Sequence, residues 1–293
     1  MSATDTRPRQ ITTIAEMRAT MQERQGKSVG LVPTMGALHE GHLSLVKQAK
    51  RECDVVVATI FVNPTQFAPH EDYQKYPRTL ESDLNLLAGA GCDLAFVPER
   101  AEMYPANAST FVEPPAVGAP LEGVCRPGHF RGVATIVLKL FNIIPADSAY
   151  FGQKDFQQAL VIRRMVADLN VPMRIVVCPI VRESDGLAMS SRNRYLSPAD
   201  RQQALALSRS LKLAERLVAS GERDAAAIKS QMSDLLTAAG IERIEYIALA
   251  DPETLVEVKE VNAPTAALIA VFVGSTRLID NEILLPQNLA PSH

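Results

Sequence analysis

Two histidines stand three residues apart in a turn that follows a short apolar run. His39 and His42 are flanked by Gly36 and Gly41, and glycines permit tight turns and a close approach of the backbone to a ligand. If both imidazoles lie where a helix begins, they share one face. The free N–H groups and the positive dipole end of a helix N-terminus suit a phosphate. The pattern predicts a phosphate site in which imidazoles donate to charge developing on a phosphoryl oxygen.

Other interpretations of this turn fail on residue type or on spacing. Gly36 and Gly41 have the glycine spacing of a P-loop, but His42 and Leu43 replace the Lys and Ser/Thr that the motif needs. The histidines are one residue too close for the HExxH zinc pattern, and no cysteine pair supplies further ligands. The chain also lacks a GxSxG and a GxGxxG motif. A purely structural turn remains the alternative.

Two amides follow a second apolar run, residues 55–62, which is rich in β-branched side chains. Asn63 and Gln66 can each donate and accept hydrogen bonds. Such side chains suit a small polar substrate with hydroxyl and carboxylate groups. An Asn-Pro turn without a binding role is the alternative here.

Cationic residues begin two further helical segments. Arg126, His129 and Arg131 precede an apolar stretch, where they can form an anion site or simply cap and solvate the helix. Lys154 follows Gly152 at a strand end, a position from which a lysine reaches a phosphate. A plain capped helix is the alternative for the second segment.

Two serines and an arginine occur together after an Asp-Gly turn signal. Ser190, Ser191 and Arg192 offer two hydroxyls and a guanidinium. This segment is predicted to be a mobile loop that closes over a triphosphate, with a plain polar linker as the alternative.

Apolar strands alternate with helices over the first 180 residues, and this pattern predicts how the polar segments are positioned. It is typical of an α/β fold with a parallel sheet covered on both faces, a Rossmann-like domain with ligands at the carboxyl ends of its strands. We expect a loose tail over residues 1–10, and a loop over 98–120 with one short strand near Phe111. The expected strands are 29–33, 55–62, 93–97, 148–152 and 174–178, and the expected helices are 13–24, 41–51, 79–88, 133–144 and 155–169.

The pattern changes near residue 184. Two helices over 198–219 and 224–239 precede strands over 244–250, 266–273 and 276–284, and Gly274-Ser275 is a hairpin signal. We therefore expect two domains, a Rossmann-like domain over 1–184 and a smaller α+β domain over 185–293.

Composition excludes several classes of protein. With 30 Lys and Arg against 33 Asp and Glu, the net charge of −3 argues against a nucleic-acid partner. The longest apolar run has eight residues, too short to span a membrane. The N-terminus has no hydrophobic signal segment. The four cysteines form no CxxC pair, which favours reduced thiols in a cytoplasmic protein.

The paired motifs resemble those of a known superfamily. The histidine turn followed by Ser-Ser-Arg is similar to the HIGH and KMSKS pair of nucleotidylyltransferases and class I aminoacyl-tRNA synthetases. Longer strings, in the same order and covering about residues 10–285, resemble the pantothenate synthetase (pantoate–β-alanine ligase) family. These strings are 33–42 (PTMGALHEGH), 61–67 (FVNPTQF), 76–79 (YPRT), 126–132 (RPGHFRG), 154–158 (KDFQQ) and 189–193 (MSSRN).

The resemblance implies a ligase of pantothenate and coenzyme A biosynthesis. It would join (R)-pantoate to β-alanine with ATP through a pantoyl adenylate, releasing AMP and pyrophosphate. It also implies a Mg²⁺ cofactor, a cytoplasmic homodimer and a C-terminal domain that covers the active site. A nucleotide-binding scaffold without turnover and a cytidylyltransferase are the alternatives, and the filled polar positions and the Asn63–Gln66 amides argue against them.

Carried over by position, the resemblance implies a role for each matching residue. His42 would donate a proton, and His39, Lys154 and Arg192 would act with it on the phosphates. Gln66 and Gln158 would bind pantoate, Gln66 also lying near β-alanine with Asn63 beside it, and Asp83 is a candidate for the shell of Mg²⁺. The nucleotide would contact Met35, Gly36, Ala37, Leu38, His39, Glu40, Gly41, His42, Gly152, Gln153, Lys154, Asp155, Val181, Met189, Ser190, Ser191 and Arg192. Gln153 departs from the family pattern, in which Glu is common.

Overall fold

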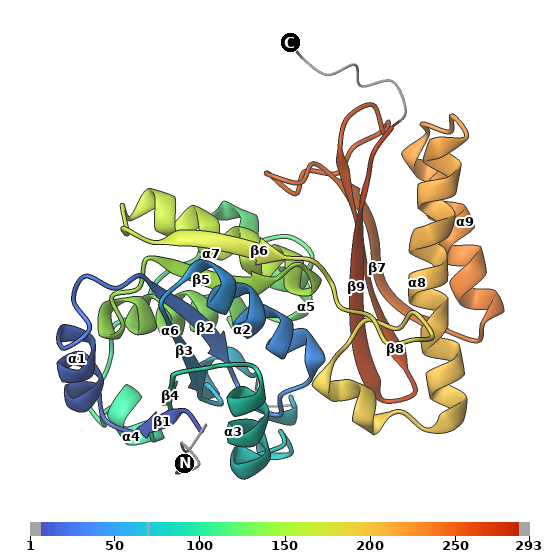
Figure 1. Ribbon diagram of the computed structural model, residues 1–293. Coiled ribbons are helices and arrows are strands. Elements are labelled where there is room, and N and C mark those ends of the chain that lie inside the picture. The colour runs from blue at the N-terminus through green and yellow to red at the C-terminus, as the bar shows by residue number, and fades with distance from the viewer. Residues whose placement is uncertain (1–6, 69–70, 287–293) are drawn as a thin grey trace. The chain divides into compact units, whose positions relative to one another are not determined.

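The computed structural model describes residues 7–68 and 71–286 (Figure 1). The chain folds into two compact units. Unit 1 comprises the described residues up to 153 together with 157–179. Unit 2 comprises residues 154–156 and the described residues from 180 onward.

A six-stranded parallel sheet forms the centre of unit 1. Its strand order is β1-β4-β3-β2-β5-β6, and every neighbouring pair is parallel. The strands are β1 (Arg9–Ile11), β2 (Val29–Thr34), β3 (Val55–Ile60), β4 (Leu94–Phe96), β5 (Ser148–Gly152) and β6 (Arg174–Cys178). The predicted Rossmann-like sheet is confirmed.

Helices connect these strands and cover both faces of the sheet (Figure 1). The α-helices are α1 (Ile14–Gln22), α2 (Glu40–Glu52), α3 (Leu80–Gly89), α4 (Arg100–Met103), α5 (Glu122–Cys125), α6 (His129–Ile143) and α7 (Phe156–Asp168). Short 3-10 turns are η1 (Pro64–Gln66), η2 (Asp72–Gln74), η3 (Ala116–Gly118) and η4 (Gln153–Asp155).

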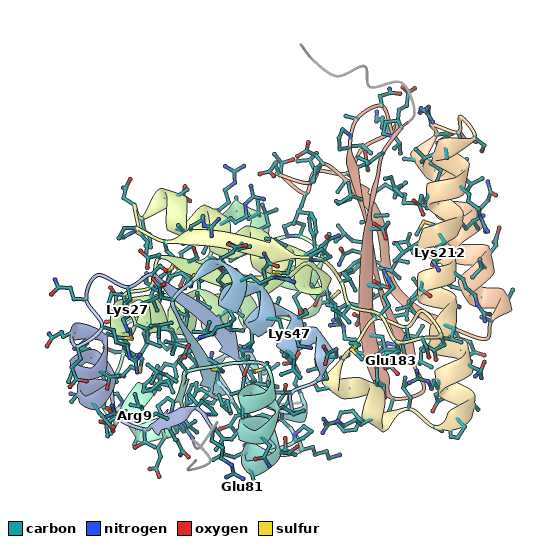
Figure 2. All side chains as sticks on the ribbon, in the orientation of Figure 1. Arg9, Lys27, Lys47, Glu81, Glu183 and Lys212 are labelled. Carbon is teal, nitrogen blue, oxygen red and sulfur yellow. The ribbon has the colours of Figure 1, made fainter. Side chains whose placement is uncertain are left out.

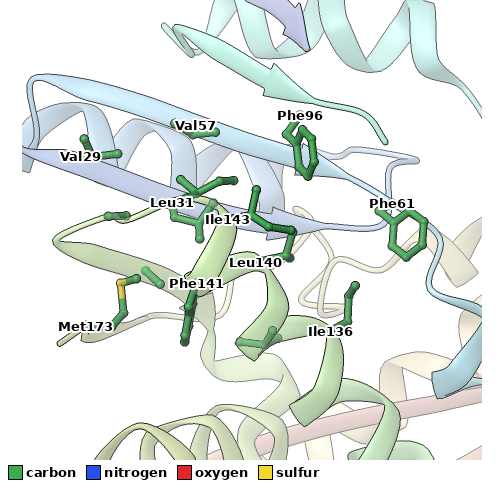
Figure 3. Close-up of a cluster of buried hydrophobic side chains, with 14 of the residues drawn as sticks. Val29, Leu31, Val57, Phe61, Phe96, Ile136, Leu140, Phe141, Ile143 and Met173 are labelled. Atoms are coloured by element: carbon green, nitrogen blue, oxygen red, sulfur yellow. The ribbon is translucent and has the colours of Figure 1, made fainter. Parts of the chain in front are cut away.

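Successive residues of a strand point to opposite faces of a sheet, which explains why the central strands are apolar throughout. Leu31 and Val57 belong to the core on the α6 side of the sheet, which also includes Leu140 and Phe141 (Figure 3). Val32, next to Leu31 in β2, belongs to the opposite core, which includes buried residues of α2 and α3. Each fully buried aliphatic side chain contributes roughly 1.5–3 kcal/mol, so the two cores fix the positions of the strand ends.

The strand order reverses at β2, which pairs with β3 on one side and with β5 on the other. In open α/β sheets, ligands bind outside the carboxyl ends of the strands at such a switch point. The segment that follows β2 contains the predicted residues His39 and His42, and β5 ends at the predicted residue Gly152. The topology therefore points to this edge of the sheet as the candidate site.

Unit 2 is a three-stranded antiparallel sheet with two helices on one face (Figure 1). Its elements are η5 (Ser191–Tyr195), α8 (Pro198–Ala219), α9 (Ala225–Ala238), β7 (Arg243–Ala250), β8 (Thr265–Val273) and β9 (Thr276–Leu284). Ser197 caps α8 in a capping box with Asp200. The predicted hairpin is confirmed, because Val273 pairs with Thr276 across Gly274, whose φ is +57°.

Two expectations from the sequence are wrong. Residues 9 and 10 belong not to a tail but to β1, which pairs with β4 and ends at the fully buried Ile11. The structure has no strand among residues 98–120, all of which it describes. Phe111 instead lies under the guanidinium of Arg131, 4.1 Å from its ring centroid.

The structure also bears on two expectations from composition, those on the cysteines and on membrane-spanning segments. All four cysteines are free, and burial raises the pKa of Cys92 to about 12, which makes that thiol unreactive. Within residues 7–68 and 71–286, no helix is long and apolar enough to cross a membrane.

Candidate active site

A buried carboxylate holds the turn that follows β2. Asp83 of α3 is 1% exposed and accepts hydrogen bonds from the backbone N–H groups of Ala37 at 3.0 Å and Leu38 at 2.8 Å. The Thr79 hydroxyl donates to both Asp83 oxygens at 3.2 Å. Gly36 and Ala37 have φ of +81° and +50°, and such a conformation costs a residue with a Cβ roughly 1–2 kcal/mol. The two N–H bonds to Asp83 offset this cost and fix the direction in which the chain enters α2.

The two predicted histidines lie together at the beginning of α2. His39 is the N-cap, and its Nδ1 accepts from the backbone N–H of Gly41 at 3.2 Å. Because an accepting Nδ1 carries no proton, the neutral ring has its proton on Nε2. The rings of His39 and His42 have centroids 4.1 Å apart and planes inclined by 38°. The predicted placement of both imidazoles on one face of a helix start is confirmed.

The amide loop, residues 63–66, follows β3. Asn63 is 1% exposed, and its Nδ2 donates to Gln66 Oε1 and to the carbonyl of Gly132, both at 3.1 Å. Its Oδ1 accepts from the hydroxyls of Tyr104 at 2.9 Å and Thr65 at 3.0 Å. These hydrogen bonds of Asn63 are all made with other groups of the protein, and the one to Gln66 orients that side chain.

Gln66 connects the amide loop to the β2–α2 turn, residues 35–39. Its Nε2 donates to Met35 Sδ at 3.0 Å. A thioether is a weak acceptor, so an oxygen atom of a ligand can replace it at little cost. The structure thus brings together two segments that are 31 residues apart in the sequence.

The backbone of the amide loop packs directly on α6. A Cβ added to Gly132 would lie 2.3 Å from the Thr65 carbonyl oxygen and 2.7 Å from Gln66 Cα. Only glycine permits this approach, which also brings the Gly132 carbonyl within reach of Asn63.

A chain of three side chains supports the same loop from below. His129 Nδ1 lies 2.8 Å from the Gln66 carbonyl oxygen, and its Nε2 lies 3.0 Å from Arg126 Nη1. Because arginine only donates, Nε2 accepts and Nδ1 carries the proton. Burial, together with the charge of Arg126, lowers the pKa of His129 to about 4. Burial opposes ionisation of Glu71, but a two-pronged ion pair with Arg126 holds its pKa below the usual value.

This network decides between the two interpretations of residues 126–131. Arg126 is paired with Glu71, His129 is neutral, and Arg131 pairs with Glu113 at 2.5 Å. The described contacts therefore favour a supporting role for these cations over an anion site.

The end of β5 supplies further predicted residues to unit 1. Gly152 ends the strand, Gln153 follows in η4, and Gln158 is the third residue of α7, each half-buried. The neighbouring Gln157 has a different role, because its amide holds the turn before α5 by hydrogen bonds to Glu122 N and to the carbonyls of Val117 and Pro120.

The remaining predicted residues lie in unit 2. Lys154 Nζ is 3.6 Å from Asp155 Oδ1, and its side chain is 20% exposed. Residues 181–189 form a small hairpin closed by hydrogen bonds from Met189 N to the Val181 carbonyl at 3.0 Å and from Glu183 N to the Leu187 carbonyl at 2.8 Å. This hairpin leads directly into the serine–arginine loop, residues 190–192.

Local hydrogen bonds shape the serine–arginine loop. The Ser190 hydroxyl caps η5 by accepting from Arg192 N at 3.3 Å, and Ser191 is buried. Asn193 Nδ2 donates to Glu183 Oε1 at 2.8 Å and to the Ala188 carbonyl at 3.1 Å. The loop is therefore fastened to the hairpin that precedes it.

The candidate metal ligand has a structural task. Both oxygens of Asp83 accept hydrogen bonds from the backbone of the β2–α2 turn and from Thr79. No group of three or more His, Cys, Asp or Glu side chains able to hold a metal ion occurs in the described part of the chain. A cavity of about 320 Å³ behind the turn is lined by Asp83, Met35 and the ends of β3 and β4.

Several supporting residues were missed from the sequence. Tyr104 lies in the stretch that we expected to be loop, directly after α4, and nothing in the sequence marks it as a candidate. Asp280 and Asn281, described below, lie within the predicted strand 276–284, which contains several polar residues. Only the structure shows that these two are buried.

The β2–β3 crossover helix of the parallel sheet, α2, begins with two histidines, and the chain has no P-loop. These features define the class, a Rossmann-like α/β protein. The sequence profile of the pantoate-beta-alanine ligase family matches residues 9–283, and the chain belongs to that family.

Individual relatives agree with this assignment. The chain is 53% identical to a pantothenate synthetase of Acidobacterium capsulatum over 94% of its own length and 97% of that protein. The crystal structure of pantothenate synthetase from Thermus thermophilus is similar with a TM-score of 0.91 at 46% identity, covering 95% of this chain and all of that one. The Francisella tularensis pantoate-beta-alanine ligase, complexed with beta-gamma ATP and beta-alanine, has a TM-score of 0.79 at 34% identity, covering 94% of this chain and 97% of that one.

Proposed function

We propose that the protein condenses (R)-pantoate with β-alanine at the expense of ATP, forming pantothenate, AMP and pyrophosphate. The observation that carries the proposal is the family match over residues 9–283. The β2–α2 turn and the amide loop support it, because the two segments are in contact within unit 1 through the hydrogen bond from Gln66 to Met35.

In the first step the pantoate carboxylate attacks the α-phosphorus of ATP, and the bond to the pyrophosphate oxygen breaks. The reaction needs positioning and neutralisation of charge on the phosphates. We assign the phosphates to the N-terminus of α2, where the Nε2–H of His39 donates and His42 supplies a proton. Lys154, Ser190, Ser191 and Arg192 are assigned to the same phosphates from unit 2.

In the second step the neutral β-alanine amine attacks the acyl carbon of pantoyl adenylate, loses a proton and expels AMP. Gln66 and Gln158 hold pantoate in this scheme, and Asn63 acts by orienting Gln66. The other proposed nucleotide contacts are Met35, Gly36, Ala37, Leu38, Glu40, Gly41, Gly152, Gln153, Asp155, Val181 and Met189.

We assign Mg²⁺ to the phosphates of ATP rather than to a protein cage. Asp83 does not fit the role of a direct ligand of Mg²⁺, because its oxygens accept hydrogen bonds from the backbone of the β2–α2 turn. Mg²⁺ commonly keeps several waters and binds through substrate phosphates. Asp83 fits a positioning role, in which it sets the turn and so the N-terminus of α2.

Domain roles and assembly are also part of the proposal. An N-terminal domain over 1–184 would bind ATP and pantoate, and a C-terminal domain over 185–293 would cover the reactive adenylate and exclude water. The enzyme would work as a homodimer in the cytoplasm. Sedimentation of the purified protein at micromolar concentration tests the dimer, and a monomeric mass would contradict it.

The activity is tested by following AMP release from ATP with pantoate and β-alanine present together or singly. AMP release should require both substrates, whereas exchange of labelled pyrophosphate into ATP should require pantoate alone. AMP release that is independent of pantoate would contradict the proposal. Release of pyrophosphate from CTP in place of ATP would identify a cytidylyltransferase.

The matched control is a mock preparation, purified in parallel from the same host carrying the vector without this gene. Because any contaminating host enzyme is present in both preparations, only the difference between them belongs to this chain. Equal activities would assign the measured reaction to the contaminant.

A further inference from the structure

Two adjacent polar residues lie in the middle of β9, a strand whose other buried side chains are mostly apolar. Asp280 is 3% exposed and Asn281 is 2% exposed. Buried polar side chains are costly unless they are hydrogen-bonded, so their partners indicate what the two residues do.

Asp280 binds the hairpin that leads into the serine–arginine loop. Its two oxygens accept from Arg182 Nη1 at 2.6 Å and Nη2 at 3.1 Å, a two-pronged pair that fixes direction as well as distance. Arg182 Nη1 also donates to the Gly186 carbonyl at 3.3 Å, and Arg182 pairs with Ala188 across the hairpin. Asp280 thus orients Arg182, which contacts the tip and the second arm of residues 181–189.

Asn281 binds the other cationic segment of unit 2. Its Nδ2 donates to the backbone carbonyl of Lys154 at 2.9 Å, across 127 residues of sequence. This bond ties residues 154–156 to β9, and these three residues belong to unit 2 although the residues on either side of them belong to unit 1.

Adjacent residues of a strand point to opposite faces of the sheet. The register between β8 and β9 is regular from Thr276 to Leu284, so the alternation holds through this region. Asp280 therefore shares a face with Leu278 and Leu284, which are in the core that includes α8 and α9. Asn281 points to the other face. Two adjacent residues of β9 therefore contact two different segments, the hairpin of residues 181–189 and residues 154–156.

We propose that Asp280 and Asn281 are positioning residues that hold Lys154 and the serine–arginine loop in one rigid body. Any displacement of unit 2 then carries Lys154 and Arg192 together, so that their spacing on the phosphates is kept. Arg182 and the Lys154 carbonyl are the groups through which the two residues act. The catalytic part of this inference rests on the proposed function.

Amide hydrogen exchange tests the structural link without any need for activity. In Asp280→Asn, the amides of Glu183, Gly186 and Met189 should exchange at least about tenfold faster, because loss of the charged pair frees the hairpin. Unchanged exchange in a folded Asp280→Asn protein would overturn the Asp280 half of the proposal.

A double-mutant cycle tests the catalytic link. Asn281→Leu should lower kcat/KM for ATP by about tenfold in the otherwise native enzyme, but by less than about twofold when Lys154 is already alanine. A merely structural role would lower the unfolding midpoint and reduce both backgrounds by the same factor. Equal factors would therefore overturn the Asn281 half.

Matched variants keep the test decisive. Asn262→Leu removes an exposed asparagine of unit 2 that donates only to Glu260 among the described contacts, and it should leave kcat/KM unchanged. If Asn281→Leu does not fold, Asn281→Ala enters the same cycle. If the native enzyme releases no AMP, the proposed function fails, and the exchange experiment still decides whether Asp280 holds the hairpin.

Discussion

The amide loop of unit 1 and the serine–arginine loop of unit 2 are supported by different kinds of interaction. Most groups that contact the amide loop are neutral: Asn63, Tyr104, Thr65 and the proton of a neutral His129. The exception is Arg126, which is paired with Glu71 behind His129 and also donates to the Gln66 carbonyl at 3.4 Å. Ion pairs support the serine–arginine loop, through Arg182 with Asp280 and through Arg201 with Glu183 and Asp185.

This difference follows from burial. A fully buried neutral network is rigid and insensitive to salt, and an unmade hydrogen bond within it is costly. The partly exposed ion pairs of Arg201 are weaker, respond to ionic strength and tolerate displacement, whereas the Arg182–Asp280 pair has a buried carboxylate and is screened less. A preorganised neutral site suits selection of a small hydroxy acid. A charged and adaptable segment suits a triphosphate that is cleaved during turnover, because pyrophosphate then leaves with its charge.

Removing the main cation of unit 2 should have the largest effect. Lys154→Ala is expected to slow pantoate-dependent pyrophosphate exchange by a few hundredfold, about 3–4 kcal/mol of transition-state stabilisation. Conversion of added pantoyl adenylate and β-alanine to pantothenate should change much less, because no triphosphate takes part in it. Near-native exchange would remove Lys154 from the chemistry.

Acid should weaken the neutral network of unit 1 next. The folded-state pKa of His129 is lowered to about 4, so between pH 6.5 and 4 the unfolded chain binds more protons than the folded one. The unfolding free energy therefore falls as pH drops through that window, by about 3 kcal/mol for this group, and levels off below pH 4. Urea unfolding at pH 7, 5.5 and 4.5 measures the slope.

His129→Asn separates this group from Arg126, Glu71 and Glu122, whose charges also act on it. The asparagine amide can still donate to the Gln66 carbonyl, so activity at pH 7 should be largely kept while the slope decreases. An identical slope in the variant and the native protein would show that His129 does not set it.

Crowding the amide loop should have a smaller but still clear effect. Gly132→Ala places a Cβ 2.3 Å from the Thr65 carbonyl oxygen, so loop and helix must separate, at a cost of about 1–3 kcal/mol in stability. We expect kcat/KM for pantoate to fall by tens of fold. Gly89→Ala is the control, because its Cβ would meet nothing within 4 Å and α3 gains helix propensity. A pantoate kcat/KM that is the same in both variants would contradict this account of Gly132.

Much of the fold was predictable because the signals are local. Apolar strands, helix caps such as Ser197, and the Gly274 hairpin each act within a few residues. The pairing of His39 with His42 was predictable for the same reason. The strand over residues 9–11 was not, because three residues carry little periodicity and β1 depends on its partner β4.

The supports of the site could not be predicted in the same way. Asp83 lies 46 residues from Ala37, Tyr104 lies 41 from Asn63, and Asn281 lies 127 from Lys154. Only the folded sheet brings such pairs together, and each residue taken alone is an ordinary polar side chain. The sequence predicts that Asn63 lies beside the substrate. In the structure its side chain donates to the Gly132 carbonyl of α6 and accepts from Tyr104, so that it supports the loop.

Weakening one ion pair of unit 2 should have the smallest effect. Glu183, labelled in Figure 2, is 27% exposed at its side chain and accepts from Arg201 at 2.6 Å and from Asn193 at 2.8 Å. Glu183→Gln keeps the shape but loses the charge, while Asp185 still pairs with Arg201. An ion pair of this exposure contributes about 0.5–1 kcal/mol, so KM for ATP should rise two- to fivefold at low salt. The difference from the native enzyme should vanish near 0.5 M salt, roughly where screening removes surface pairs.

The control is Glu81→Gln, which breaks an exposed ion pair with Arg7 in unit 1 and should leave KM for ATP unchanged. A Glu183→Gln effect that persists undiminished in high salt would mean that hydrogen bonding, not charge, holds the serine–arginine loop, and the two loops would then be supported in the same way.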